Sequence, residues 1–407
     1  MEKRIDGEKS ACSPADKQID LSTVDQCARC GTCRAYCPVL EESGWESANA
    51  RGRLMILQAL EKGLPADSCV RDSLNTCTTC GICTENCPAG LNPPRLIEKG
   101  RRKLVLSGIT GPEHETLASN IYQRGNTFGD PGDRLSWLRD RGLLREKAEY
   151  VYFAGCMNSY RYKETAARTF DLLRRFGVTM LPNEQCCGSP LLRTGFAAAG
   201  LMEENRRQIR QIGAHTVITG CAGCYTTLKN DYPPQFQVVS VAEFLDERIS
   251  EMQKCKEQYT NQKMYQNINQ NGAQNSSPVL NLRRLDLTVT YHDPCHLGRH
   301  NRIYDPPRRV IEAVCRLVEM KSSKKDARCC GGGGGVRAGY RELSLQMAKK
   351  RLLDVPEGVD YIVTSCPLCI RNLSDAGAGE KVIDLVDLVA KALLDDSNPN
   401  WPQRKNP

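Results

Sequence analysis

The sequence predicts an α+β, multidomain protein in which a small helical domain is followed by two repeated α/β domains. Cysteines crowd the first hundred residues in two similar runs, which leave room only for short helices. From about residue 150 onward, β-branched runs alternate with amphipathic helices, as in open α/β layers with mostly parallel strands. Corresponding cysteines in this region are 139 to 145 residues apart, so one structural unit occurs twice.

Composition shifts along the chain predict five segments. The segment ARGRLMILQALEKG (50–63) has apolar positions at helical spacing, and GITGPEHE and GNTFGDPGD predict an extended strap after it. A stretch rich in Asn and Gln predicts a flexible linker between the two copies. The expected segments are a helical domain (1–105), a connector (106–149), a first α/β domain (150–250), a linker (251–284) and a second α/β domain (285–396).

The two α/β copies predict the same order of strands and helices. The first copy reads as strands YVYFAGC, VTML and TVITGCAGC, with helices at 161–176 and 197–213 between them. The second copy reads as strands LTVTYHDPC, LVEM and YIVTSCPLC, with helices at 306–317 and 338–353. Because the carboxyl ends of parallel strands form the usual ligand crevice, the cysteines at these ends predict a site there.

The helical domain carries two iron-sulfur motifs of the ferredoxin type. CARCGTCRAYCP (27–38) and CTTCGICTENCP (77–88) both spell C-x2-C-x2-C-x3-C-P, the run that wraps a cubane [4Fe-4S] cluster. Since the fourth cysteine serves the other cluster in two-cluster ferredoxins, one cubane is assigned Cys27, Cys30, Cys33 and Cys87, and the other Cys77, Cys80, Cys83 and Cys37. Structural zinc is the alternative, but zinc sites usually place two C-x2-C pairs farther apart. Two adjacent clusters predict an electron path of unknown direction.

Each α/β copy also offers five cysteines in the pattern C…CC…C-x2-C. They are Cys156, Cys186, Cys187, Cys221 and Cys224 in the first copy, and Cys295, Cys329, Cys330, Cys366 and Cys369 in the second. Five thiols exceed the four corners of a cubane, so they favour an enlarged, irregular cluster. The five glycines at 331–335 would let the backbone approach sulfide or substrate and take positive φ. A phosphate-binding loop and disulfides or inert thiols are the alternatives.

Charge and hydropathy limit the possible partners. The net charge is +8, but the basic residues are scattered, and no nucleic-acid-binding module accompanies them, so we expect no nucleic acid. The 22 cysteines and the lack of an apolar leader predict the reducing cytoplasm. No run of 18 apolar residues occurs, so we expect no direct membrane span and only peripheral attachment, on the inner face, through a partner.

Other polar residues lie close to these motifs. His292 and His296 flank Cys295, and each is a candidate for donating a proton or a hydrogen bond to cluster sulfur, with a backbone-satisfied buried histidine as the alternative. Three cations could hold an anionic substrate, or could be a solvated surface: Arg299, Arg337 and Lys229. Four cysteines receive no role: Cys12, Cys69, Cys255 and Cys315. Of these, Cys315 is expected in a helical run of the core.

YHDPCHLGRHNRIYDPPR, RCCGGGGGVRAG and TSCPLCIRNL, together with the two cubane motifs, resemble the D-subunit family of heterodisulfide reductases over nearly the whole chain. In that family the five-cysteine unit is the CCG, or cysteine-rich, domain. The resemblance implies two cubane and two noncubane [4Fe-4S] clusters, with the ten cysteines of the two five-cysteine sets (the late cysteines) as catalytic residues. Their position beside Cys295 adds His292 and His296 to the predicted catalytic set. The resemblance also implies an anaerobic enzyme, of the kind used in methanogenesis, that splits a disulfide of the CoM-S-S-CoB type between its noncubane clusters.

The resemblance leaves a second function open. Related iron-sulfur proteins carry electrons for flavin-dependent lactate or glycolate dehydrogenase complexes. The implied partner is therefore a membrane protein of the cytochrome b type for the enzyme, or a flavoprotein oxidoreductase for the electron carrier. Completeness of both five-cysteine sets favours the enzyme, since some relatives that serve only as carriers have a degenerate set.

Overall fold

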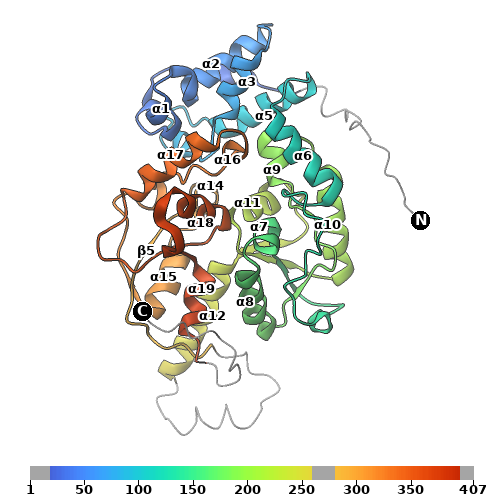
Figure 1. The fold of residues 1–407 in the computed structure, drawn as a ribbon, viewed down its shortest axis with the longest axis vertical. Helices are drawn as coiled ribbons and strands as arrows, with labels where there is room; N and C mark the ends of the chain where they lie inside the picture. Colours follow the sequence, from blue (N-terminus) through green and yellow to red (C-terminus); the bar gives the residue numbers. More distant parts are fainter. Residues whose placement is uncertain (1–18, 259–279, 395–407) are drawn as a thin grey trace, which may run out of the picture.

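A helical domain lies against two α/β domains that stand side by side (Figure 1). The fold comes from a computed structural model that describes residues 19–258 and 280–394. The predicted linker falls largely on residues 259–279, outside the described part of the chain. Its predicted start at 251 is wrong, because helix α12 (Val241–Gln258) continues without a break through that position.

The helical domain is built from short helices around the two cysteine runs. Its helices are α1 (Pro38–Ser43), α2 (Ala50–Glu61), α3 (Ser68–Asn75), α4 (Ile82–Glu85) and α5 (Pro93–Leu106). The predicted helix at 50–63 is α2, which begins where the Asn49 side chain accepts a hydrogen bond of 3.3 Å from the Gly52 amide. A small core of Leu57, Leu74 and Ile97 holds α2, α3 and α5 together.

The first α/β domain contains a four-stranded parallel sheet in the order β2-β1-β3-β4. Its strands are β1 (Tyr150–Phe153), β2 (Thr179–Met180), β3 (Thr216–Thr219) and β4 (Gln237–Ser240). Its helices, besides α12, are α7 (Gly155–Tyr160), α8 (Lys163–Leu173), α9 (Ser189–Thr194), α10 (Ala199–Ile212) and α11 (Ala222–Asn230). Cys156 lies in α7 rather than at the end of the predicted strand, because β1 ends at Phe153 and Gly155 turns the chain at φ 76°.

The second α/β domain repeats this arrangement in the order β6-β5-β7-β8, again all parallel. Its strands are β5 (Thr288–Tyr291), β6 (Arg316–Leu317), β7 (Tyr361–Thr364) and β8 (Val382–Asp384). Its helices are α14 (Gly298–Asn301), α15 (Asp305–Val314), α16 (Val336–Gly339), α17 (Arg341–Leu352), α18 (Pro367–Leu373) and α19 (Leu385–Ala392). The predicted α+β architecture with repeated parallel units is therefore confirmed.

Four details differ from the prediction. Of the predicted strand LVEM (317–320), only Leu317 lies in a strand, β6. The helix predicted at 306–317 ends at Val314, because the backbone at Cys315 is already extended. Strands β4 and β8 were not predicted, since no cysteine follows either of them directly. The connector is not an extended strap throughout, because it contains helix α6 (Pro112–Arg124), with Pro112 in its first turn and Gly125 at its end.

The two α/β domains share one hydrophobic core. Buried side chains of the first domain, including Tyr152, Phe170 and Ile218, belong to the same packed cluster as Val363 and Leu388 of the second. Helices α12 and α15 lie side by side at this junction, as do α8 and α19 (Figure 1). The carboxyl ends of the two sheets are therefore held in a fixed relation to each other. None of the helices in the described ranges has both the length and the apolar character needed to span a bilayer.

Candidate functional site

Two cysteine-lined cavities lie in the helical domain. The first is lined by Cys27, Cys30, Cys33 and Cys87, together with Cys83. The second is lined by Cys37, Cys77, Cys80 and Cys83. In each cavity the fourth cysteine of one motif lies with the first three of the other, which is the arrangement that the crossed ligand assignment requires. The assignment itself stays a prediction.

The backbone of the two motifs is bent in the same way. Arg29 and Thr79 both have positive φ, 55° and 52°, at equivalent positions of their C-x2-C segments. Gly31 and Gly81 follow with φ of 83° and 77°. A β-branched residue such as Thr79 rarely adopts this conformation, and such backbone strain concentrates at functional sites. The strain therefore supports a loop shaped to enclose a bound group.

The donor set fits an iron-sulfur cluster. Burial raises the pKa of the Cys83 thiol well above its usual range, and the neighbouring Cys77 and Cys80 raise it further. Closely packed buried thiols ionise readily only when a cationic group compensates their charge. Iron is such a group. The thiols of Cys77, Cys80 and Cys83 line one cavity, so a single bound group in that cavity could contact all of them.

The cysteine groups continue from the helical domain into both α/β domains. Cys80 interacts with Cys329 of the second domain, and Cys329 in turn with Cys295. The sulfur atoms of Cys330 and Cys369 are 3.3 Å apart. The thiols thus form a continuous series from the helical domain into the second α/β domain.

The two five-cysteine sets meet at one contact. Cys366 of the second domain interacts with Cys221 of the first. Within the first set, Cys224 contacts Cys187, and Cys186 contacts Cys156. The structure thus brings the late cysteines together in two groups that face each other across the junction between the two sheets.

The glycine run at 331–335 serves contact between domains. Gly331, Gly334 and Gly335 have positive φ, as expected. A Cβ on Gly334 would lie 2.3 Å from the carbonyl oxygen of Cys77, and one on Gly333 would lie 2.8 Å from that of Thr78. The expectation that the glycines admit sulfide or substrate is therefore corrected at these two positions, where the approaching group is the backbone of the second cubane motif.

Arg101 joins all three domains at this contact. Its fully buried guanidinium donates to the carbonyl oxygens of Leu74 (2.7 Å) and Cys77 (2.6 Å) in the helical domain. It also donates to the carbonyl oxygen of Gly334, at 2.8 Å, and to that of Arg193 in the first α/β domain, at 2.5 Å. Burial lowers its pKa to about 10. Sequence reasoning missed Arg101, because nothing in the pattern of helix α5 distinguishes it from its basic neighbours.

His114 of the connector supports the other end of the glycine run. Its Nε2 lies 3.0 Å from the carbonyl oxygen of Gly335, to which the neutral ring donates. Burial lowers the pKa of His114, so the folded protein favours the neutral ring. The unfolded chain takes up this proton near pH 6.5, so the contribution of His114 to stability is complete above that pH and declines as the pH falls below it.

We expect His114→Gln to flatten the pH dependence of unfolding between pH 6.5 and 5. The wild type should lose at most about 1.4 kcal/mol per pH unit through this group, and the variant should not. Urea unfolding of the intact protein at several pH values measures the difference. Identical slopes for the two proteins would contradict the role assigned to His114.

His292 lies against the second five-cysteine set. Arg351 donates from Nε to His292 Nδ1 at 3.0 Å, and because a guanidinium only donates, the neutral imidazole must carry its hydrogen on Nε2. The buried Nε2 has no partner among the described residues. The His292 ring and the sulfurs of Cys330 and Cys369 lie within 4.8 Å of one another. The neighbouring Cys329, first of all, together with Cys369 and the nearby His292, lowers the pKa of Cys330 well below its usual range.

His296 contacts the same set from another side. Its Nδ1 lies 3.4 Å from the sulfur of Cys295, and its ring stacks on that of His300 with the centroids 4.6 Å apart. His300 binds the carbonyl oxygen of Thr79, at 2.9 Å, in the second cubane motif. Burial lowers the pKa of His300 to about 4, so this ring is neutral. His296 and His300 therefore form a second bridge between the cubane loop and the late cysteines.

The cations expected to hold a substrate are largely engaged elsewhere. Arg299 is buried and donates to the carbonyl oxygens of Cys80 (2.8 Å) and Ala327 (2.6 Å). Arg337 pairs with Asp375. The expectation is therefore corrected for these two residues, whose charge is used within the protein. The exposed Lys229 donates to the Tyr225 hydroxyl at 3.0 Å and stays a candidate.

The connector supplies a cation to the first five-cysteine set. Arg134 Nη2 lies 3.4 Å from the sulfur of Cys156, and Nη1 donates to Glu184 at 2.8 Å. Glu184 accepts hydrogen bonds from the amides of Ala154 and Gly155. Arg134 was missed because no sequence motif links it to Cys156. The unassigned Cys315 is buried in the core as expected, but it follows helix α15 instead of lying within a helix. Cys69 is exposed, and the side chains of Cys12 and Cys255 lie outside the described residues.

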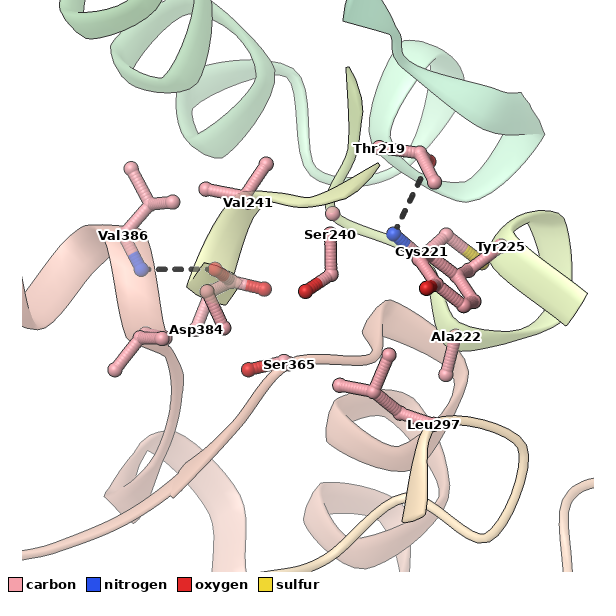
Figure 2. A pocket seen from close by; sticks show the side chains of 13 residues that line it. Thr219, Cys221, Ala222, Tyr225, Ser240, Val241, Leu297, Ser365, Asp384 and Val386 are labelled. Atoms are coloured by element: carbon pink, nitrogen blue, oxygen red, sulfur yellow. Dashed lines mark hydrogen bonds between the residues drawn. The ribbon is translucent and has the colours of Figure 1, made fainter. Parts of the chain in front are cut away.

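A small cavity lies between the two α/β domains at the ends of β3, β4 and β8 (Figure 2). Cys221, Tyr225 and Ser240 line it from the first domain, and Ser365 and Asp384 from the second. In Figure 2 the side-chain oxygens of Ser240, Ser365 and Asp384 point toward one another. The cavity thus adjoins the place where Cys221 meets Cys366.

Family comparisons match this architecture segment by segment. A 4Fe-4S dicluster domain matches residues 23–91, and a cysteine-rich domain, CCG, matches residues 150–229 and 289–374. The chain is 35% identical to the D-subunit of the dihydromethanophenazine:CoB–CoM heterodisulfide reductase of Methanosarcina acetivorans, over 92% of this chain and 95% of that protein. The chain belongs to the D-subunit family of heterodisulfide reductases. It is an iron-sulfur oxidoreductase of that family, and the resemblance seen in its motifs is confirmed.

Other members of the family have different named activities. The chain is 31% identical to the B-subunit of the fumarate reductase (CoM/CoB) of Methanothermobacter marburgensis, over 94% of this chain and 75% of that protein. It is 27% identical to the EtfAB:quinone oxidoreductase of Syntrophomonas wolfei, over 92% of this chain and 59% of that protein. Family membership therefore leaves the substrate open.

Proposed function

We propose that the chain reduces a disulfide of the CoM-S-S-CoB type with electrons that enter through the helical domain. The observation that carries this proposal is the continuous series of cysteine groups. It runs from the first cubane motif to the second, then through Cys80 and Cys329 to the second five-cysteine set. It ends where that set meets the first, at Cys366 and Cys221.

Four groups of cysteines would hold the clusters. Cys27, Cys30, Cys33 and Cys87 hold one cubane, and Cys77, Cys80, Cys83 and Cys37 the other. The five cysteines of each α/β domain hold one noncubane cluster. When bound, the cubanes supply one-electron transfer, and the noncubane pair supplies the centre at which a sulfur-sulfur bond is cleaved. The protein contributes by burying these thiols and by keeping the two late sets opposed.

The series of thiols also indicates where electrons enter. Cys30 is exposed, whereas Cys77, Cys80 and Cys83 are buried, and Cys80 interacts with Cys329 of the second α/β domain. A donor can thus approach the first cubane motif from solvent, while the second motif faces the late cysteines. This face would receive the partner, a membrane protein of the cytochrome b type or a flavoprotein, and would place the chain peripherally at the inner face of the membrane.

A second candidate is an electron carrier within a flavin-dependent lactate or glycolate dehydrogenase complex. The similarity to an EtfAB:quinone oxidoreductase favours it, because the activity named for that relative involves a quinone and not a disulfide. The same series of cysteines would serve this function. The two candidates differ in whether a thiol or disulfide binds where the two late sets meet.

The experiment that separates them uses anaerobically purified chain with reduced viologen as the electron donor. The proposal predicts reduction of CoM-S-S-CoB and, in oxidised protein, a new paramagnetic signal when either thiol is added. If the chain transferred electrons to a flavoprotein but reduced no disulfide and showed no thiol-dependent signal, the disulfide reductase proposal would fail. The electron-carrier function would then be supported.

His292 is expected to raise the reduction potential of the cluster held by the second set. A ring nitrogen of His292 lies within 4.8 Å of the sulfurs of Cys330 and Cys369, and hydrogen bonds to cluster sulfur stabilise the reduced state. We expect His292→Asn to lower that potential and His292→Gln, which can keep a donor near Nε2, to lower it less. A redox titration followed by electron paramagnetic resonance compares them. Equal potentials in all three proteins would argue against the hydrogen bond.

A further inference from the structure

We propose that Asp384, in the cavity between the two α/β domains, holds the proton that a newly formed thiolate takes up. This inference rests on the proposed disulfide reduction. It starts from the buried carboxyl group of Asp384, of which only one oxygen has a hydrogen-bond partner among the described residues.

Asp384 ends strand β8 and is 3% exposed. Its Oδ1 accepts a hydrogen bond of 2.9 Å from the amide of Val386, at the start of helix α19. Its buried Oδ2 has no hydrogen-bond partner among the described residues. Figure 2 shows this free oxygen turned toward Ser240 and Ser365, that is, into the cavity.

The environment of Asp384 favours the neutral acid. The residues that line the cavity, all of them in the described part of the chain, include no Lys, Arg or His. Burying a carboxylate without a cation or a full set of donors is costly, so such a group keeps its proton. Burial raises the pKa of Asp384 well above its usual range, and the nearby Asp387 raises it further. The orphaned Oδ2 is therefore the site of an O–H group.

Helix capping does not require an acid at this position. The equivalent residue in the first repeat is Ser240, which ends β4 and begins α12. The Ser240 hydroxyl accepts from the amide of Glu243 at 3.1 Å, while Glu243 Oε2 accepts from the Ser240 amide at 2.9 Å, which makes a capping box. A serine thus caps the matching helix, and the acidic proton of Asp384 is left for another purpose.

The cavity connects Asp384 to the late cysteines. Cys221 lines it, and Ser365 is the residue before Cys366, the partner of Cys221 across the junction. The free volume of about 10 Å³ is roughly that needed by one water molecule. A water there would have Asp384 Oδ2 and the serine hydroxyls as partners, and could pass the proton on toward the sulfur.

A hydrogen-bonded route can return the proton from solvent. The Ser240 hydroxyl also lies 2.9 Å from Glu243 Oε2. Glu243 interacts with the hydroxyl of Tyr225, which accepts from the exposed Lys229 at 3.0 Å. The route therefore leads from the molecular surface to the cavity wall opposite Asp384.

The chemistry balances with the proposed function. One disulfide, two electrons and two protons give two thiols, and the electrons come from the external reductant through the helical domain. Asp384 supplies one proton to a thiolate sulfur, becomes a carboxylate, and is protonated again from solvent before the next turnover. The other proton comes from solvent.

The test compares Asp384→Asn and Asp384→Ser with wild type, using reduced viologen and CoM-S-S-CoB. Asparagine and serine both retain a cap for α19, so both variants should fold with unchanged iron content and unchanged reduction of the helical-domain clusters. We expect turnover to fall by roughly 100-fold in each, the size of effect typical of a lost proton donor. The matched control is Asp171→Asn, which changes an exposed acid paired with Arg174 and should keep the wild-type rate.

A second measurement does not depend on activity. The infrared spectrum of wild type should contain the carbonyl band of a protonated carboxylic acid that shifts in deuterium oxide and is missing from Asp384→Asn. Absence of this band, or wild-type turnover in both Asp384 variants, would overturn the inference. If wild type reduced no disulfide, the proposed function would fail, and the infrared band would still decide whether Asp384 holds a proton.

Discussion

Replacing Gly334 by alanine is expected to separate the second α/β domain from the helical domain. The new Cβ would lie 2.3 Å from the carbonyl oxygen of Cys77, and the residue would have to keep φ at 62°. It would also disturb the carbonyl that Arg101 binds. We expect a loss of about 3 kcal/mol or more in the free energy of unfolding, together with slower electron transfer out of the helical domain.

Gly358→Ala is the matched control for this prediction. Gly358 also has positive φ, 74°, but a Cβ there would meet no atom within 4 Å. It should show only the backbone cost of the left-handed conformation, about 1 kcal/mol. Urea unfolding of both anaerobic proteins measures the difference. Equal destabilisation by the two substitutions would mean that the contact between Gly334 and Cys77 contributes nothing.

Cys330→Ser is expected to abolish disulfide turnover while leaving the spectra of the helical-domain clusters unchanged. The Cys330 sulfur lies 3.3 Å from that of Cys369 and within 4.8 Å of a His292 ring nitrogen, so it is central to the second five-cysteine set. It lies outside both cavities of the helical domain. Turnover and electron paramagnetic resonance on the same preparation test this separation.

Cys69→Ser is the control for the cysteine substitution. Cys69 is exposed in helix α3 and belongs to none of the four groups, so its replacement should change neither turnover nor spectra. If Cys330→Ser removed the signals of the helical domain as well, the loss of turnover would reflect misfolding. Full turnover in Cys330→Ser would remove Cys330 from the site.

The sequence predicts the parts of the site that depend on fixed spacing. The two C-x2-C-x2-C-x3-C-P runs identify the helical domain because a small cluster dictates the distances between its ligands. The recurrence of Cys295 and Cys366 about one unit after Cys156 and Cys221 predicts the repeated sheets. These features need only local chain geometry, and local geometry can be read from one sequence.

The parts that depend on contact between domains could not be predicted. Arg101 binds carbonyl oxygens of three domains, and no pattern within its helix indicates this. The glycines at 331–335 were expected to face a bound group, whereas Gly333 and Gly334 face the backbone of the second cubane motif. Asp384 was missed because no motif marks strand β8, and its free oxygen becomes visible only when the two sheets are placed together.

The most direct test of the account is quantitative iron and acid-labile sulfide analysis of the anaerobically purified chain. If the four groups of thiols each hold a four-iron cluster, the protein should contain roughly sixteen irons and a similar amount of sulfide per chain. A value near eight would leave the late cysteine sets without clusters. Such a value, or zinc in place of iron, would contradict the claim that the sulfur-sulfur bond is cleaved between the two α/β domains.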